Sequence, residues 1–369
     1  MFTDVIILAG GSGERLWPVS DDRKPKQFMA LSDGISFLQA AIQRAAALSI
    51  SETICIITRR SWIDLAVEEV VSLSKKMGLP NLPGKVLIMG EPFGKNTAPA
   101  IAWYCRHLEV EGRADNSNIL LMASDHIIES QDQFTRDAHT ASLFASRNNL
   151  VSFSIVPTHP ATGYGYIKAG ERLANPDGTP SSAYVVDSFR EKPDADTASA
   201  YLSQGSYYWN SGIYAFRSDF YMEEIGKHCP ALLDAFRKAS GLSTIEEVQG
   251  VRVMRSWDGL ESAYTASPSI SIDYAVSEKC DRSVTVTAGF SWDDVGTWDS
   301  MAEYYPDLPA NTVSVSASNC FVRSDIPVAL CDVHDIIVVI HEGKALVSRR
   351  GSSNLVKDAL AAMKEKKIQ

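Results

Sequence analysis

Residues 5–18, VIILAGGSGERLWP, join an apolar run to a glycine-rich loop. The apolar part, residues 5–9, predicts a strand buried on both faces, as in a parallel sheet. Glycines stand at positions 10, 11 and 13, and Arg15 follows two positions later. Glycines let the backbone approach an anion closely, and a guanidinium offers a fork of donors to phosphate oxygens. The stretch therefore predicts a buried strand that ends in a phosphate-binding loop.

Two familiar phosphate loops do not fit this spacing. No Lys-Ser or Lys-Thr closes the loop, as a Walker A sequence requires. A dinucleotide fingerprint needs a third glycine three residues after the second, and position 16 is leucine, which argues against a nicotinamide-dependent oxidoreductase. A third kind of phosphate loop or a purely structural turn remains.

A second group of cations follows the loop. Arg23, Lys24 and Lys26 lie in the segment RKPKQF. Alone, such a segment indicates a solvated basic turn. Beside a glycine-rich loop it favours triphosphate binding, because a triphosphate needs several cations.

Apolar runs alternate with helical patterns through the first third of the chain. The further predicted strands are residues 53–58, 86–89 and 119–122, and the predicted helices are residues 37–48, 61–77 and 97–109. This alternation predicts an α/β fold, a mostly parallel sheet with helices on both faces. Strands at 151–156, 184–189 and 212–216 are less regular, and we expect them to form an insertion on the ligand-binding side of the sheet.

The C-terminal part has a different pattern. Short β-rich runs at residues 312–315, 328–331, 336–340 and 345–347 precede a polar helix at 354–366. We expect a catalytic domain at residues 1–297. A linker near 298–309, which contains two prolines, then leads into a small β-rich unit that completes residues 298–369.

Composition excludes several kinds of partner. The chain has 369 residues, of which 45% are hydrophobic, and a net charge of -10. That charge argues against nucleic acid as partner, because binding its backbone needs a basic face. The six cysteines form no CxxC pair, which fits reduced cytoplasmic thiols. No targeting signal follows Met1 and no apolar run approaches the ~20 residues that span a bilayer, so we expect a cytoplasmic protein with no membrane partner.

An aspartate follows the apolar run 119–122. Asp125 would lie at the carboxyl end of a strand, where α/β proteins bind ligands. Magnesium prefers hard oxygen ligands, one or two carboxylates together with phosphates and water. Asp125 is therefore a candidate magnesium ligand, with a turn-forming aspartate as the alternative, while His126 is expected to be structural.

The chain resembles the sugar nucleotidyltransferases, in particular the mannose-1-phosphate guanylyltransferases. The resemblance lies in segments that occur in the same order: 8–20, 24–28, 91–100 (EPFGKNTAPA), 162–167, 189–193 (FREKP), 209–214, 271–279 and 290–298. It implies the Rossmann-like nucleotidyltransferase fold with a C-terminal unit similar to a left-handed β-helix. The longer relatives carry a phosphomannose isomerase domain, for which the residues after Trp298 are too few, so a second activity is not expected.

The resemblance also implies roles for individual residues. Arg15 and Lys26 would be the catalytic cations on the triphosphate. The implied nucleotide site comprises Leu8, Ala9, Gly10, Gly11, Ser12, Gly13, Glu91, Asn96, Thr97, Ser124 and Asp125. The implied sugar phosphate site comprises Gly165, Glu191, Lys192 and Asn210. Asp125 and Asp294 would hold Mg²⁺.

Some of these assignments stay open. Lys95 stands where the family usually has arginine, so a bidentate contact there is in doubt. Capping of the following helix is the alternative role of Thr97. Asp273 fits a helix cap, and Asp293 is an alternative to Asp294 because the motif alignment could slip by one.

The implied reaction joins mannose 1-phosphate to the guanylyl part of GTP and yields GDP-mannose and pyrophosphate. The phosphate of the sugar is already ionised at neutral pH, so no strong general base is needed. The alternatives are a glucose-1-phosphate nucleotidyltransferase of the same fold and a non-catalytic regulatory homologue. The C-terminal unit is the candidate surface for a homodimer.

Overall fold

The computed structural model describes residues 1–31 and 33–367, and the chain divides into two compact units. The first, here the sheet unit, comprises Met1–Gly10, Gln39–Ser124 and Ile128–Trp292. The second, here the loop unit, comprises Gly11–Leu38, Asp125–Ile127 and Asp293–Gln369. This division differs from the predicted boundary after residue 297, because it groups the glycine-rich loop with the C-terminal strands. The 1–297 and 298–369 boundary itself stays a prediction.

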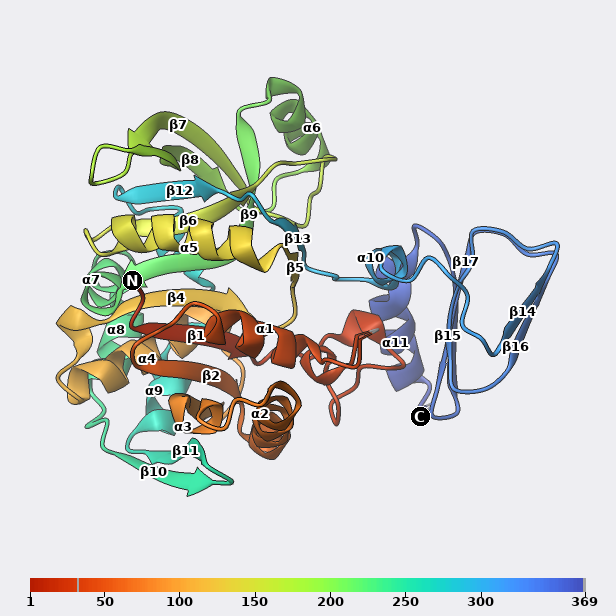
Figure 1. The fold of residues 1–369 in the computed structure, drawn as a ribbon, viewed down its shortest axis with the longest axis horizontal. Helices are drawn as coiled ribbons and strands as arrows, with labels where there is room; N and C mark the ends of the chain where they lie inside the picture. Colours follow the sequence, from red (N-terminus) through yellow and green to blue (C-terminus); the bar gives the residue numbers. More distant parts are fainter. Residues whose placement is uncertain (32, 368–369) are drawn as a thin grey trace. The chain divides into compact units, whose positions relative to one another are not determined.

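The sheet unit contains an 11-stranded mixed sheet. Its strands are β1 (Asp4–Ala9), β2 (Thr53–Arg59), β3 (Val86–Glu91), β4 (Asn118–Ala123), β6 (Leu150–Ile155), β7 (Tyr166–Ala174), β8 (Pro180–Arg190), β9 (Tyr207–Arg217), β10 (Ser243–Val248), β11 (Val251–Trp257) and β12 (Ser283–Thr287). Their order is β10-β11-β3-β2-β1-β4-β9-β6-β12-β8-β7 (Figure 1). The strands from β11 to β4 are parallel to one another, as the apolar runs predict.

Helices cover both faces of this sheet, which confirms the predicted fold class (Figure 1). They are α1 (Phe37–Ala46), α2 (Ile63–Met77), α3 (Leu82–Lys85), α4 (Thr97–Val110), α5 (Gln131–Ala145), α6 (Ala195–Gln204), α7 (Ser218–His228), α8 (Pro230–Arg237) and α9 (Leu260–Ala266). Alternate strand residues such as Ile6, Ile57 and Leu121 share a core with α4, α7, α8 and α9. Helices α2 and α5 pack on strands β2, β3, β4 and β6.

The strands after residue 150 correct the expectation of an insertion on the ligand-binding side of the sheet. Strand β9 pairs antiparallel with both β4 and β6, so the later strands continue the central sheet. The physical reason is the open hydrogen-bonding edge of β4, which β9 fills with a largely buried strand.

The C-terminal strands of the loop unit form a short coil with a regular repeat. The C-terminal part of the loop unit contains α10 (Trp298–Glu303), β14 (Thr312–Val315), β15 (Phe321–Ser324), β16 (Val328–Cys331), β17 (Ile336–His341), β18 (Lys344–Arg349) and α11 (Val356–Glu365). Thr312 pairs with Val328, and Phe321 pairs with Ile337. Both pairings are parallel, and in each the partners are sixteen residues apart in the sequence. Two successive stretches of chain thus stack as coils, as the expected β-rich unit requires, and the handedness of the coil stays a prediction.

The glycine-rich loop shares its hydrophobic core with these C-terminal elements. Leu16, Trp298, Phe321 and Val356 belong to one buried cluster. The indole Nε1 of Trp298 donates to the carbonyl oxygen of Trp17 at 2.8 Å. The segment expected to be a linker therefore begins with a helix, α10, whose first residue is a core residue.

Two short strands, β5 (Ile127–Glu129) and β13 (Ser291–Asp293), complete the elements used below. Within residues 1–31 and 33–367, the helices are all too short or too polar to cross a bilayer.

Replacement of Trp298 tests the shared core of the loop unit. Trp298→Ala should lower the free energy of unfolding by about 3–5 kcal/mol, because it removes a buried indole. Trp298→Phe keeps an aromatic ring and loses one hydrogen bond, so it should cost about 1 kcal/mol. Urea unfolding of the three proteins measures both values. An alanine variant as stable as the wild type would show that this core does not hold the loop unit together.

Candidate functional site

The glycine-rich loop folds closely around the segment that carries Lys26. Gly13 has a φ of 63°, a left-handed conformation that favours glycine. A Cβ atom on Gly13 would lie 2.4 Å from the Cβ of Lys26, so a larger residue cannot fit. The hydroxyl of Ser20 donates to the carbonyl oxygen of Ser12 at 2.8 Å and closes the loop.

A cavity of about 190 Å³ lies beside this loop, entirely within the loop unit. Its lining includes six of the predicted residues, from three parts of the chain: Ser12, Gly13, Arg15, Lys26, Asp125 and Asp294. His126, Gly296 and Lys357 also line it. The fold thus brings together the predicted triphosphate cations and both predicted magnesium carboxylates.

The side chain of Lys26 is the centre of this arrangement. Only 4% of it is exposed, and its ammonium donates to Asp125 Oδ2 at 3.0 Å and to the carbonyl oxygen of Asp294 at 2.5 Å. It also lies 5.0 Å from the centre of the Phe37 ring, a favourable cation–π position. A buried lysine needs such partners, because an unpaired charge is costly to remove from water.

Asp125 is held in its ionised form. Burial alone would raise the pKa of its carboxyl group, but the positive charges of Lys26 and His126 outweigh burial and leave the pKa below its usual value. The carboxylate is therefore ionised at neutral pH and can act as an oxygen ligand.

The structure distinguishes Asp294 from its neighbour Asp293. Asp294 lines the cavity, and its Oδ1 accepts from the backbone N–H of Gly296 at 3.2 Å. Asp293 instead accepts from the N–H of Val295 at 2.6 Å and from the hydroxyl of Tyr304 at 3.3 Å. A Cβ on Gly296 would lie 3.2 Å from both Arg15 Nη2 and Asp294 Oδ2, so this glycine makes room for the two charged groups.

The donor set of the cavity suits magnesium. Asp125 and Asp294 offer carboxylate oxygens and no sulfur or imidazole ligand is required. No group of three or more His, Cys, Asp and Glu side chains that could hold a metal occurs among residues 1–31 and 33–367. Magnesium does not need one, because it commonly uses one or two carboxylates together with substrate phosphates and water.

A second cluster of predicted residues lies in the sheet unit, at the ends of β1 and β3. A Cβ on Gly10 would lie 2.8 Å from Glu91 Oε2, so glycine is needed for this close approach. The hydroxyl of Tyr264 donates to Glu91 Oε1 at 3.0 Å, and the guanidinium of Arg59 donates to the carbonyl oxygen of Gly10 at 3.2 Å. The N–H of Ser124 donates to the carbonyl oxygen of Leu8. The hydroxyl of Thr58 donates to the carbonyl oxygen of Ala9.

Glu91 has a strongly shifted pKa. Burial raises the pKa to about 7, against the opposing effects of the Tyr264 hydroxyl and the Arg59 charge. Glu91 is therefore a carboxyl group that changes its protonation state near neutral pH.

The start of α4 excludes the alternative that Thr97 caps this helix. Asn96 is the N-cap, and its side-chain oxygen accepts from the N–H of Thr97 at 2.9 Å. The hydroxyl of Thr97 accepts from the N–H of Ile272 at 2.9 Å instead. Lys95, in the place of the family's arginine, donates to the carbonyl oxygen of Ser267 at 3.0 Å.

The residues predicted for the sugar phosphate gather elsewhere in the sheet unit. A Cβ on Gly165 would lie 2.5 Å from Glu191 Oε2, and the carbonyl oxygen of Gly165 accepts from the N–H of Asn210 at 2.8 Å. Lys192 donates to Glu191 Oε1 at 2.8 Å. Burial, together with repulsion from Asp273, raises the pKa of Glu191 above its usual value although Lys192 opposes this.

Asp273 is a residue of this cluster that the sequence did not identify as functional. Its Oδ1 accepts from Asn210 Nδ2 at 3.0 Å and from the Tyr214 hydroxyl at 2.7 Å. Asn210 Nδ2 also donates to Tyr214, and Asn210 Oδ1 accepts from the N–H of Gly212. The amide donors of Asn210 are thus engaged, which leaves one lone pair of its oxygen for a ligand. The family-like segment 271–279 was the available signal for Asp273.

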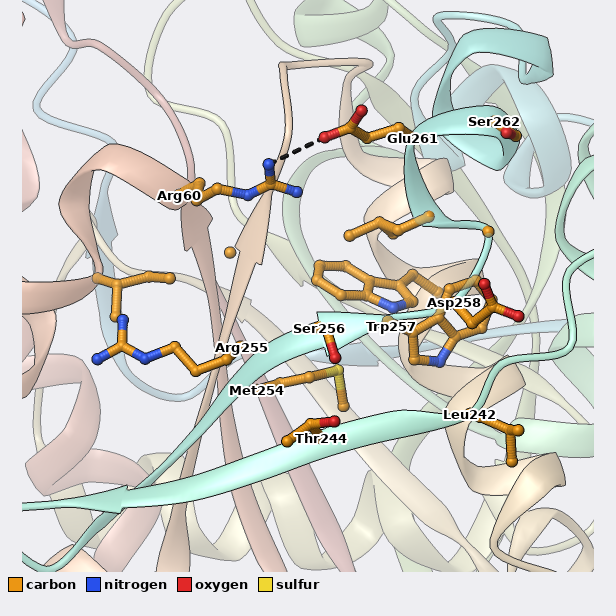
Figure 2. A pocket seen from close by; sticks show the side chains of 15 residues that line it. Arg60, Leu242, Thr244, Met254, Arg255, Ser256, Trp257, Asp258, Glu261 and Ser262 are labelled. Atoms are coloured by element: carbon orange, nitrogen blue, oxygen red, sulfur yellow. Dashed lines mark hydrogen bonds and ion pairs between the residues drawn. The ribbon is translucent and has the colours of Figure 1, made fainter.

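Another cavity, which at about 850 Å³ is larger than the one beside the glycine-rich loop, is not lined by the predicted residues. It lies between β10, β11 and the start of α9, with Arg60 and Glu261 at 3.0 Å as an ion pair on its rim (Figure 2). Cavity size alone therefore does not locate the predicted chemistry in this fold.

The mixed sheet, the glycine-rich loop and the two aspartates that line the cavity beside it indicate an enzyme that acts on nucleotides. The chain belongs to the nucleotidyl transferase family, whose model matches residues 4–311. It is 37% identical to mannose-1-phosphate guanylyltransferase of Salmonella montevideo and 36% identical to that of Klebsiella pneumoniae. These alignments cover 99% and 98% of this chain and 74% of each relative.

A solved structure agrees with these relatives. The chain resembles the crystal structure of mannose-1-phosphate geranyltransferase from Thermus thermophilus with a TM-score of 0.80. The two are 27% identical, and the match covers 99% of this chain and 100% of that one. The predicted fold class and family are thereby confirmed.

The raised pKa of Glu91 predicts a pH-dependent stability. The folded state keeps a proton that the unfolded state releases above its pKa of 4.5, so this contribution to stability is lost as pH rises from about 4.5 to 7. The loss should approach about 3 kcal/mol, because each pKa unit corresponds to about 1.4 kcal/mol. Glu91→Gln should abolish this part of the pH dependence.

Urea unfolding at pH 5 and pH 8 measures the difference. Glu247→Gln is the matched control, because Glu247 is an exposed glutamate on β10. Parallel pH profiles for wild type and Glu91→Gln would contradict the raised pKa.

Proposed function

We propose that this protein transfers the guanylyl group of GTP to mannose 1-phosphate, giving GDP-mannose and pyrophosphate. The observation that carries the proposal is the 37% identity to a mannose-1-phosphate guanylyltransferase across 99% of the chain. The cavity that joins Arg15 and Lys26 to two aspartates supports it, because this reaction needs cations and a metal site at a triphosphate.

The proposed chemistry is an in-line displacement. The phosphate of the sugar attacks the α-phosphorus of GTP, and pyrophosphate leaves. In the loop unit, Arg15 and Lys26 would neutralise charge on the triphosphate, and the backbone N–H groups of the glycine-rich loop would orient it. No general base is needed, since the attacking phosphate is already ionised.

Nucleotidyl transferases as a family use a divalent metal, and we propose magnesium at Asp125 and Asp294. When bound, this ion would offset negative charge that develops on the phosphate. Asp293 is not proposed as a ligand, because its two oxygens accept from Val295 and Tyr304.

In the sheet unit, Glu91 would bind the base, and Gly165, Glu191, Lys192 and Asn210 would bind the sugar phosphate. An ionised Glu91 can accept from the two adjacent donors on the edge of guanine, which adenine and the pyrimidines do not present in the same pattern. Glu191 can accept from sugar hydroxyls and Lys192 can reach a sugar phosphate. Asn210 would contribute the remaining lone pair of its oxygen, with Asp273 and Tyr214 fixing its orientation.

We also propose a cytoplasmic location without nucleic-acid partners and a homodimer formed through the C-terminal unit. The exposed Val313 and Val315 side chains on β14 support such an interface. Analytical ultracentrifugation of wild type and a Val313→Lys, Val315→Lys double variant tests it.

Pyrophosphate release tests the proposed function. The wild type is assayed with GTP, ATP, UTP and dTTP, each with mannose 1-phosphate, and with GTP and glucose 1-phosphate. GTP with mannose 1-phosphate should give the highest kcat/KM. A preference for glucose 1-phosphate would identify the related nucleotidyltransferase, and no release with any pair would identify a non-catalytic homologue.

Conservative variants of the aspartates test the metal site. Asp125→Asn and Asp294→Asn should each lower kcat by about a hundredfold or more and raise the Mg²⁺ concentration that gives half the maximal rate, because each removes a charged oxygen ligand. Asp293→Asn is the matched control and should change the Mg²⁺ dependence little. The reverse pattern, with Asp293 sensitive and Asp294 insensitive, would move the metal to the neighbouring residue.

A further inference from the structure

Lys357, on the C-terminal helix, lines the phosphate-loop cavity together with Arg15 and Lys26. It is the second residue of α11, and this helix packs against the turn Glu14–Leu16 of the glycine-rich loop. More than 300 residues separate Lys357 from the loop in the sequence, and nothing in the pattern of the final helix marks it as functional.

Several contacts fix the start of α11, and therefore the position of Lys357. The carboxylate of Asp299 accepts from the N–H groups of Gly351 at 2.7 Å and Ser353 at 3.1 Å. Val356, directly before Lys357, is a buried residue of the core that contains Leu16. The Asp299 hydrogen bonds and the burial of Val356 therefore fix the backbone of Lys357 beside the glycine-rich loop.

The charges around the cavity show what Lys357 adds. Arg15 and Lys26 face three carboxylates, those of Glu14, Asp125 and Asp294. The ammonium of Lys26 is already bonded to Asp125. Even with the positive charge of His126, the lining without Lys357 carries no excess of positive charge to attract an incoming polyphosphate.

Lys357 itself is available to a ligand. Its side chain is exposed. Among residues 1–31 and 33–367, no carboxylate oxygen lies within 4.0 Å of its ammonium group, so it forms no ion pair there. A lysine ammonium on a flexible stem is a common phosphate-binding group, with three donors and no fixed plane.

We propose that Lys357 binds the terminal phosphates of the nucleoside triphosphate and the pyrophosphate that leaves. The C-terminal helix is then part of the phosphate site and not only an appended structural element. The inference rests on the proposed nucleotidyl transfer for its substrate class, but not on guanine or mannose.

Equilibrium binding of inorganic pyrophosphate tests the inference independently of base and sugar. Isothermal titration of the full-length protein in excess MgCl₂ gives the Kd of pyrophosphate for wild type, Lys357→Ala, Lys357→Arg and Lys364→Ala. Lys364 is the matched control, because it is an exposed lysine of the same helix that does not line the cavity.

Lys357→Ala should weaken pyrophosphate binding by about tenfold or more, the usual effect of removing a charge-assisted hydrogen bond. Lys357→Arg should retain most of the affinity and Lys364→Ala all of it. In steady-state assays the KM for GTP should rise with Lys357→Ala, while the KM for mannose 1-phosphate should stay within about twofold of its wild-type value, a difference that general loss of structure would not produce.

An alanine variant at position 357 that binds pyrophosphate as tightly as the Lys364 control would overturn the inference, as would a wild type that binds no pyrophosphate. A different preferred nucleotide or sugar, with the expected loss of pyrophosphate affinity, would overturn the proposed function and leave the role of Lys357 in place.

Discussion

The ion pair between the buried ammonium of Lys26 and the carboxylate of Asp125 is the interaction on which the cavity beside the glycine-rich loop depends. Lys26 lies after the glycine-rich loop, Asp125 after strand β4 and Asp294 after strand β13, so one side chain connects three distant parts of the sequence. Loss of one partner of such a pair leaves a buried charge without compensation, which typically costs about 3–5 kcal/mol. The geometry therefore fixes the position of the ammonium group, the charge state of Asp125 and the backbone of Asp294 at once.

This arrangement places a limit on what Lys26 can do for a substrate. An ammonium group has three donors, and two are used by Asp125 and Asp294. One donor remains for a phosphate oxygen, so in the proposed reaction Lys26 would combine its structural role with phosphate binding. The guanidinium of Arg15 and the carboxylate of Asp294 both lie next to Gly296. A guanidinium is better suited than the ammonium of Lys26 to bind two oxygens at once.

The sequence predicted the local elements well, because strong apolar periodicity and glycine placement determine them. Strands β14 and β16 match their predictions at both ends, and β1 differs by one residue. Long-range pairing was harder to predict. The position of β9 between β4 and β6 depends on which strand edge is open, and the parallel coil of the C-terminal strands depends on a sixteen-residue register with little sequence identity.

The candidate site divides in the same way. Arg15, Lys26 and Asp125 could be found because glycines, cations or a strand end mark them locally, and the resemblance added Asp294. Asp273 and Lys357 were not identified. The family-like segment 271–279 was the signal for Asp273, which begins a short π-helix, but its role follows from its contacts with Asn210 and Tyr214. A lysine on a polar helix is ordinary in sequence, and Lys357 is distinguished by the cavity that it lines.

The core of the loop unit explains why the conformation of the glycine-rich loop depends on C-terminal residues. A loop of glycines and polar residues cannot bury enough apolar surface to hold a fixed shape, because ordering each residue costs about 1–2 kcal/mol of conformational entropy. Leu16 supplies an anchor, but it needs apolar partners, and Trp298, Phe321 and Val356 provide them. The C-terminal strands and helix therefore stabilise the conformation of the loop through packing. Lys357 directly follows Val356 on α11, so the packing of Val356 places its charge beside the loop. The stability of the loop and the charge of its cavity therefore depend on the same segment of chain.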